Sequence, residues 1–158
     1  MENKDGVTIV VFSGDMDKVM AAFNIAVGAA AAGKETTMFF TFWGIKAIQK
    51  GNLTGRSFFG RMMGLLNRGG INRIGPSRFN FGGIGRWMFK QMMKMHNVTS
   101  LEELRKIAID MGVKLVPCQM SMEVMEIGRE DLIDEVAEPA GVATMLEAAS
   151  RSAATLFI

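Results

Sequence analysis

The pattern of apolar and polar residues at the start of the chain predicts a strand, a helix and a second strand. The β-branched apolar run 7–12 is typical of a strand, and Asp15, shortly after it, is suited to cap a helix. Apolar residues then recur at helical spacing up to about residue 32, where Gly33 is suited to end a helix. A further apolar run at 35–42 predicts the second strand. This order predicts a βαβ unit with parallel strands.

A similar pattern returns in the C-terminal part. Ser100 and Glu103 have the spacing of a capping box, which predicts a helix over 101–111 that ends at Gly112. The remaining expected elements are strands at 113–116, 135–137 and, buried, at 153–158, with helices at 120–127, 130–133 and 141–151. Together these elements predict an α/β fold: one domain over residues 1–158, with three α/β/α layers and a mainly parallel five-stranded sheet.

Residues 43–97 do not follow this order. Eleven of the eighteen glycines lie between Gly44 and Gly85, mixed with Arg, Phe and Met, which predicts an irregular basic insertion with short helices. Helical periodicity is clear only at 84–95. From residue 36 to residue 101 there are ten basic residues and no acidic residue. This charge asymmetry bears on the electrostatic partners of the protein rather than on its fold.

Composition and single residues exclude several classes of protein. The chain is 49% hydrophobic, which is typical of a globular protein. It lacks the pattern of a secretory signal and any apolar run near the roughly 20 residues that cross a bilayer. One cysteine excludes an internal disulfide, and one histidine, His96, with no carboxylate within four residues, argues against a metal site. No cofactor motif is present, and a cytoplasmic protein is expected.

Cys118 is the main candidate for chemistry. It follows the predicted strand 113–116 and precedes a predicted helix, whose N–H groups favour a thiolate. Gln119 and Ser121 near the start of that helix are candidates for binding an anionic substrate. Ser13 and Gly14 are weaker candidates at the carboxyl end of the first strand, where helix capping explains them equally well. The alternative for Cys118 is a small buried apolar residue.

Three known uses of a nucleophilic cysteine do not fit. A cysteine-based phosphatase needs an arginine six positions after its cysteine, where this chain has Val124. A peroxiredoxin needs threonine or serine three positions before the cysteine and proline seven before it, and here Leu115 and Met111 stand there. A papain-like enzyme needs a histidine base, and nothing in the sequence links His96 to Cys118.

The sequence V-P-C-Q-M-S-M-E-V-M-E-I-G around Cys118, and E-D-L-I-D before the last helix, resemble the DsrE/DsrF-like sulfur-transfer superfamily. The resemblance is strongest to its Met-rich DsrE-like subgroup, often labelled "peroxiredoxin family", and covers nearly the whole chain. It implies homo-oligomers and a cysteine that carries sulfane sulfur as a persulfide or thiosulfonate. The donor would be a sulfane sulfur compound, and the acceptor a small sulfur-carrier protein or a low-molecular-weight thiol. With no second cysteine, sulfur must leave Cys118 by attack of an external thiol.

The basic insertion leaves three interpretations open. It can be a solvated face whose Met and Phe residues pack inward or against another subunit. It can dock an acidic partner or an anionic sulfur substrate. It can also contact a membrane surface through a basic amphipathic helix that carries Arg86, Trp87, Lys90 and Lys94. Nucleic acid is disfavoured, because no binding motif accompanies the charge.

The leading hypothesis is therefore a cytoplasmic sulfur carrier or sulfurtransferase-like protein that uses Cys118. The alternative is a non-catalytic interaction protein or membrane-surface adaptor, in which the thiol has no role. A thiol peroxidase comes third, because of the missing threonine and proline.

Overall fold

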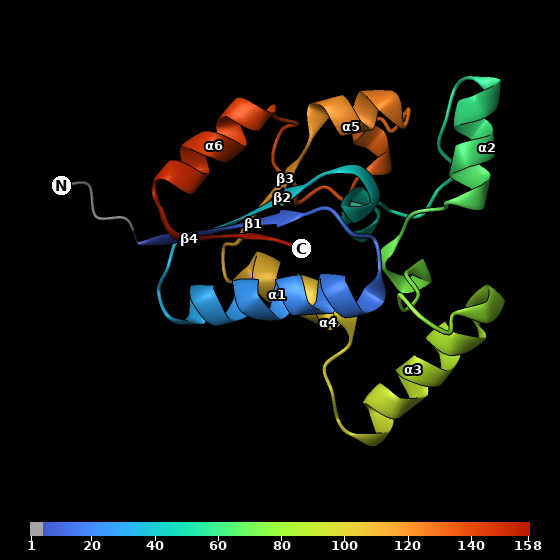
Figure 1. The fold of residues 1–158 in the computed structure, drawn as a ribbon, viewed down its shortest axis with the longest axis horizontal. Helices are drawn as coiled ribbons and strands as arrows, with labels where there is room; N and C mark the ends of the chain where they lie inside the picture. The colour runs from blue at the N-terminus through green and yellow to red at the C-terminus, as the bar shows by residue number, and fades with distance from the viewer. Residues whose placement is uncertain (1–4) are drawn as a thin grey trace.

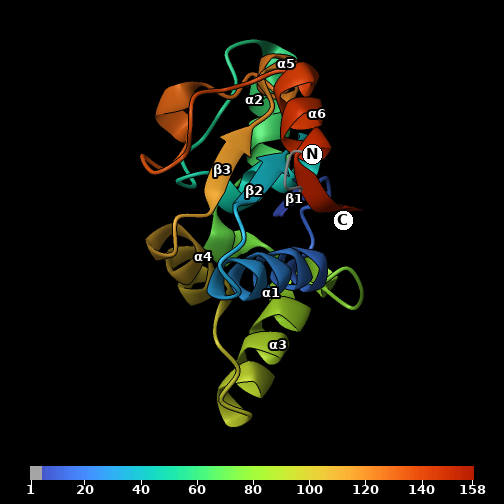
Figure 2. The same cartoon turned by 90° about the vertical axis from the view of Figure 1, so that its left-hand side faces the viewer.

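The structure, a computed structural model, describes residues 5–158 and contains one parallel sheet with strand order β3-β2-β1-β4. The strands are β1 (Gly6–Val11), β2 (Thr36–Phe40), β3 (Lys114–Pro117) and β4 (Ser152–Phe157). Helices α1 (Met16–Ala31) and α4 (Leu101–Asp110) cover one face of the sheet, and α5 (Gln119–Val124) and α6 (Val142–Ser150) cover the other (Figure 1). Figure 2 shows the sheet between these two layers. The predicted parallel α/β fold is confirmed.

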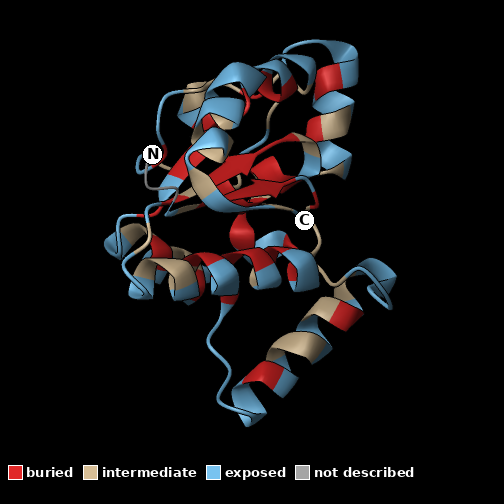
Figure 3. Ribbon diagram, turned by 60° about the vertical axis from the view of Figure 1, so that its left-hand side comes forward, coloured by how far each residue is buried: buried red, intermediate tan, exposed pale blue. Residues whose placement is uncertain are grey.

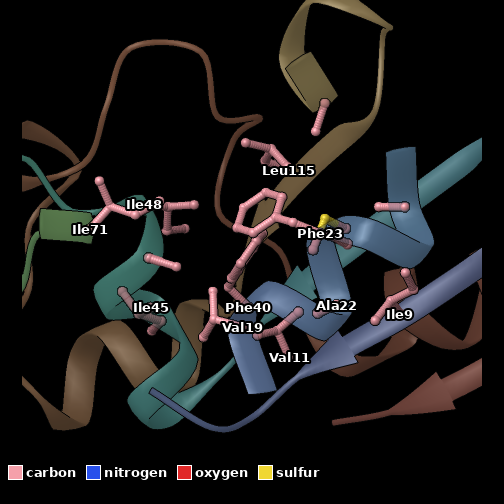
Figure 4. Packing of buried hydrophobic residues seen from close by; sticks show 14 of the residues in the cluster. Ile9, Val11, Val19, Ala22, Phe23, Phe40, Ile45, Ile48, Ile71 and Leu115 are labelled. Atoms are coloured by element: carbon pink, nitrogen blue, oxygen red, sulfur yellow. The ribbon is translucent and has the colours of Figure 1, made fainter. Parts of the chain in front are cut away.

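The main hydrophobic core lies between the sheet and the layer of α1 and α4. Phe23 of α1 packs against Phe40 of β2, with ring centroids 6.0 Å apart, and Leu115 of β3 belongs to the same cluster (Figure 4). All three side chains are almost completely buried, and burial of such side chains is the main source of stability. Buried residues concentrate in the sheet and on the inner faces of these helices, whereas α6 contains none (Figure 3).

Local signals in the sequence explain where the two long helices of this layer begin and end. Helix α1 has Asp15 at its N-cap position, as predicted, but the Asp15 side chain makes no capping hydrogen bond. Gly33 beyond the end of the helix has φ 76°, a conformation that favours glycine. Helix α4 has the predicted capping box: the Ser100 hydroxyl accepts the Glu103 N–H at 3.2 Å, and the Glu103 carboxylate accepts the Ser100 N–H at 3.0 Å.

The prediction of a fifth strand at 135–137 is wrong. The N–H groups of Ala137 and Ala140 donate to Leu115 and Pro117 carbonyl oxygens at 2.8 and 3.0 Å, so the segment does run beside β3. Residues 134–136 form a turn and a bend, and the isolated bridge of this region comes later, between Ala140 and Cys118, after Pro139, which has no N–H to donate. A turn of 3-10 helix, η4 (Arg129–Asp131), precedes it. The sheet of the described residues therefore has four strands.

The last strand is also less buried than predicted. β4 pairs with β1 alone and lies at the edge of the sheet, and most of its side chains, Phe157 among them, are exposed. An apolar sequence predicts a strand, but its burial depends on which elements lie beside it. The homo-oligomer that the family resemblance implies stays a prediction.

Residues 43–97 contain short helices, as expected. They are η1 (Phe42–Ile48), α2 (Phe58–Leu66), η2 (Ile71–Arg73), η3 (Phe81–Gly83) and α3 (Ile84–Met95). η1 approaches β1 so closely that a Cβ atom on Gly44 would collide with the Val11 carbonyl group. Helices α2 and α3 lie at the end of the molecule away from α6, with α2 on the α5 side of the sheet and α3 on the α1 side (Figures 1 and 2). That this segment is an insertion stays an expectation.

Within residues 5–158, every helix is too short or too polar to cross a bilayer.

Candidate functional site

Cys118 lies at the carboxyl end of β3, where the chain passes from the sheet into α5. Its backbone N–H donates to the Phe40 carbonyl oxygen at 2.8 Å, so the neighbouring strand β2 holds it in place. The residue has an extended backbone conformation and occupies the N-cap position of α5. The thiol therefore stands at the position that the sequence predicted, at a strand tip and before a helix.

Two buried hydroxyl groups lie beside the thiol. The side chains of Thr41 and Ser121 share a hydrogen bond of 2.8 Å. Ser121 is in the first turn of α5 and is completely buried, and Thr41, also buried, directly follows β2. The sequence pointed to Ser121 but not to Thr41, which the predicted strand 35–42 placed inside regular structure. The available signal was that parallel neighbouring strands bring their carboxyl-end residues together.

These groups favour the thiolate form of Cys118. Burial is the largest influence and by itself raises the pKa of the thiol. Hydrogen bonding to the hydroxyl and the N–H of Ser121, to the hydroxyl of Thr41 and to the N–H of Met120 lowers the pKa and outweighs burial. The net result is a pKa below the ordinary value of a cysteine, which suits a nucleophile and a leaving group.

The Cys118 side chain is nevertheless covered. The residue is only 5% exposed and belongs to a small apolar cluster with Val10, Phe39 and Val116. Ala140 and Met145, from the segment before α6 and from α6 itself, pack against this cluster. A reagent or partner can reach the sulfur only if that cover moves.

Gln119 does not turn its side chain towards the thiol. Its amide group donates to the Glu123 carboxylate at 2.9 Å on the exposed side of α5, and its backbone N–H donates to the Ala140 carbonyl oxygen at 3.0 Å. The backbone of Gln119 thus holds the cover over Cys118.

Ser13 and Gly14 do not lie beside Cys118. They line a hollow of about 390 Å³ at the carboxyl end of β1, together with Trp43 and Lys46 from η1. Cys118 is not part of this hollow. The Ser13 hydroxyl donates to the Asp15 carboxylate at 3.1 Å and accepts the Asp15 N–H at 3.2 Å. Burial lowers the pKa of Lys46, and the negative charge of Asp15 opposes that effect in part.

The four α3 residues lie away from Cys118, on the side of the sheet that carries α1 and α4 (Figure 1). Arg86 and Lys90 donate to backbone carbonyl oxygens of the loop at η2, at 2.6 and 3.1 Å, so they attach α3 to the body of the protein. Trp87 is exposed, and Lys94 lines a hollow of about 960 Å³ between α3 and α4. These residues do not form one site with the thiol.

Residues 5–158 bring together no group of three or more histidine, cysteine, aspartate or glutamate side chains that could bind a metal ion.

Comparison with known proteins identifies the family. The sequence model of the DsrE/DsrF/DrsH-like family matches residues 3–157, so the chain belongs to this family. The chain is 44% identical over 153 residues to the uncharacterized protein YrkE of Bacillus subtilis, with 96% of this chain and 95% of that protein covered. It is 32% identical over 161 residues to the sulfur carrier protein DsrE2 of Allochromatium vinosum, and both chains are covered completely.

A solved structure supports the fold. The crystal structure of the ychN protein from E. coli superimposes with a TM-score of 0.60 and covers 98% of this chain and 99% of its own. At 11% sequence identity this likeness shows the fold alone.

Proposed function

We propose that the protein is a sulfur carrier that holds sulfane sulfur on Cys118 as a persulfide. The observation that supports this most directly is the position of Cys118 at the tip of β3 and the N-cap of α5, where the buried hydroxyl groups of Ser121 and Thr41 help to lower the pKa of its thiol despite burial. The relative described as a sulfur carrier protein, which is similar over its full length, supports the same function.

In the first step, the Cys118 thiolate, having lost its proton to solvent, attacks the outer sulfur of a persulfide or polysulfide donor. The sulfur–sulfur bond of the donor breaks, its electron pair leaves with the donor thiolate, and Cys118 becomes a persulfide. In the second step, an external thiolate attacks the outer sulfur, and Cys118 leaves as a thiolate. No electrons are gained or lost overall, and neither step needs a second cysteine in this chain.

The buried hydroxyl groups act in both steps. They stabilise negative charge on the Cys118 sulfur, first in the attacking thiolate and later in the leaving thiolate. The cover formed by Ala140 and Met145 protects the sulfur between the steps and must open for each of them. Helix α6 has no buried residue, so its displacement disturbs little of the core.

The test is mass spectrometry of the intact protein and its peptides after treatment with polysulfide, with and without reductant. We expect a reductant-labile sulfur adduct confined to the Cys118 peptide and absent from Cys118→Ser. Transfer of this sulfur to an added thiol should be lost in the same variant. The proposal is wrong if the native protein takes up no sulfur where a known carrier does, or if Cys118→Ser transfers sulfur equally well.

A further inference from the structure

Helix α2 (Phe58–Leu66) turns its apolar side to solvent. Five of its large apolar residues form one exposed helical stripe, and Met63 beside it is half-buried: the stripe is Phe58, Phe59, Met62, Leu65 and Leu66. Phe58 is 78% and Leu66 is 77% exposed. The only buried residues of the helix are Gly60 and Gly64. A surface helix of a globular protein normally buries such a stripe, so α2 has the opposite orientation.

This orientation follows from how the helix is attached. A Cβ atom on Gly60 would collide with the Glu126 carboxylate, and one on Gly64 with the Thr54 carbonyl group. Only a glycine face fits this close against the body of the protein. The Glu126 carboxylate also accepts the N–H groups of Arg56 and Ser57, at 2.5 and 2.7 Å, at the start of the helix.

The charged residue of α2 itself is positive. Arg61 is exposed, and no acidic residue occurs between residues 36 and 101. Arg56, just before the helix, is also exposed and lies 3.9 Å from the Glu130 carboxylate, and the Glu126 carboxylate lies against Gly60, on the side of the helix that faces the protein. A second copy docked through the same stripe would bring arginine against arginine, which disfavours a symmetric dimer at this face. A binding partner for this surface must offer an apolar region for the stripe and negative charge for the arginine beside it.

We propose that α2 docks on the surface of an anionic lipid bilayer. Phe58, Phe59, Leu65 and Leu66 would enter the interfacial region, and the exposed arginines would contact the headgroups. Nine residues are far too few to cross a bilayer, so the helix lies along its surface.

This docking is independent of sulfur transfer. Helix α2 is nevertheless linked to the segment that carries the thiol, because Glu126 lies just beyond the end of α5, which starts after Cys118. A protein bound in this way would hold its carrier cysteine close to the membrane surface.

The test is co-sedimentation of the full chain with vesicles of equimolar phosphatidylcholine and phosphatidylglycerol, and with vesicles of phosphatidylcholine alone. We expect binding to the anionic vesicles that weakens with added salt. Phe58→Ser/Phe59→Ser should lower the partition coefficient at least about tenfold. Arg61→Gln should weaken binding by about fivefold, and mainly at low salt.

The matched control is Val142→Ser/Leu146→Ser, which removes two exposed apolar side chains from α6 and should leave binding unchanged. Circular dichroism of each variant verifies its fold. Cys118→Ser should bind vesicles like the native protein, which separates this inference from the proposed function. Two results would overturn it: equal binding by Phe58→Ser/Phe59→Ser, or no binding of the native protein to the anionic vesicles. In the second case, an oligomer that light scattering shows to be dissociated by those two changes would identify a second copy as the occupant of the stripe.

Discussion

The surroundings of Cys118 and the surface of α2 are opposite in construction. At Cys118, a thiol and two hydroxyl groups that are hydrogen bonded to each other are buried beneath an apolar cover. On α2, large apolar side chains stand in solvent and glycines face the protein. Polar groups inside a protein are costly unless they are paired, and apolar groups outside it usually mark a contact surface. The first arrangement supports the proposed sulfur chemistry, and the second supports the proposed attachment to a membrane surface.

The largest expected effect concerns stability and contrasts two phenylalanines. Phe40→Ala, in the core, should lower the free energy of unfolding by about 3–5 kcal/mol, because it removes a fully buried ring and leaves a cavity. Phe59→Ala, on α2, should change it by less than about 0.5 kcal/mol. Chemical denaturation measures both. A loss of several kcal/mol for Phe59→Ala would show that α2 packs against the body through its apolar stripe.

A smaller effect concerns access to Cys118. Met145→Ala should raise the rate of Cys118 alkylation by iodoacetamide several-fold, because Met145 packs on the apolar cluster that contains the thiol. Leu146→Ala is the matched control: the next residue of the same helix is exposed, and its removal should leave the rate unchanged. Equal rates in both variants and the native protein would mean that another segment controls access.

The smallest effect concerns the pKa of Cys118. Ser121→Ala should raise this pKa, because it removes the hydroxyl group that opposes burial most strongly. The folded-state pKa is depressed, so the thiolate contributes stability above the pKa of an unfolded cysteine, and that contribution is lost as pH falls through the folded value.

The measurement of the Cys118 pKa is the pH dependence of the alkylation rate. Its midpoint should move to higher pH in Ser121→Ala and stay in place in Thr41→Ser, which keeps a hydroxyl. If the midpoint does not move in Ser121→Ala, the Ser121 hydroxyl does not stabilise the Cys118 thiolate.

Some elements could be predicted from the sequence because their signals are local. The capping box at Ser100 and Glu103 uses residues three positions apart, and the helical periodicity at 84–95 coincides with α3. Cys118 was placed at a strand tip by the apolar run before it. In each case the residues that give the sequence pattern are the same residues that form the cap, the helix or the strand.

The errors arose where distant contacts decide the outcome. Residues 135–137 have the composition of a short strand, but the chain turns there, and the isolated bridge forms only after Pro139, between Ala140 and Cys118. The last strand was predicted as buried because it is apolar, although it lies at an edge with one neighbour. Thr41 was missed because its partner Ser121 is 80 positions away in the chain.

The sequence by itself determined the parallel α/β fold, the family and the single cysteine that any sulfur chemistry must use, because periodicity, motif and composition are properties of neighbouring residues. Only the tertiary structure decided that the thiol meets two buried hydroxyls under a cover, and that the stripe on α2 faces outward. An amphipathic pattern states that a helix has an apolar side, but packing against the rest of the chain selects the side that is buried. On α2 the side that faces the protein is set by two glycines, Gly60 and Gly64, and by the carboxylate of Glu126, more than fifty residues further along the chain.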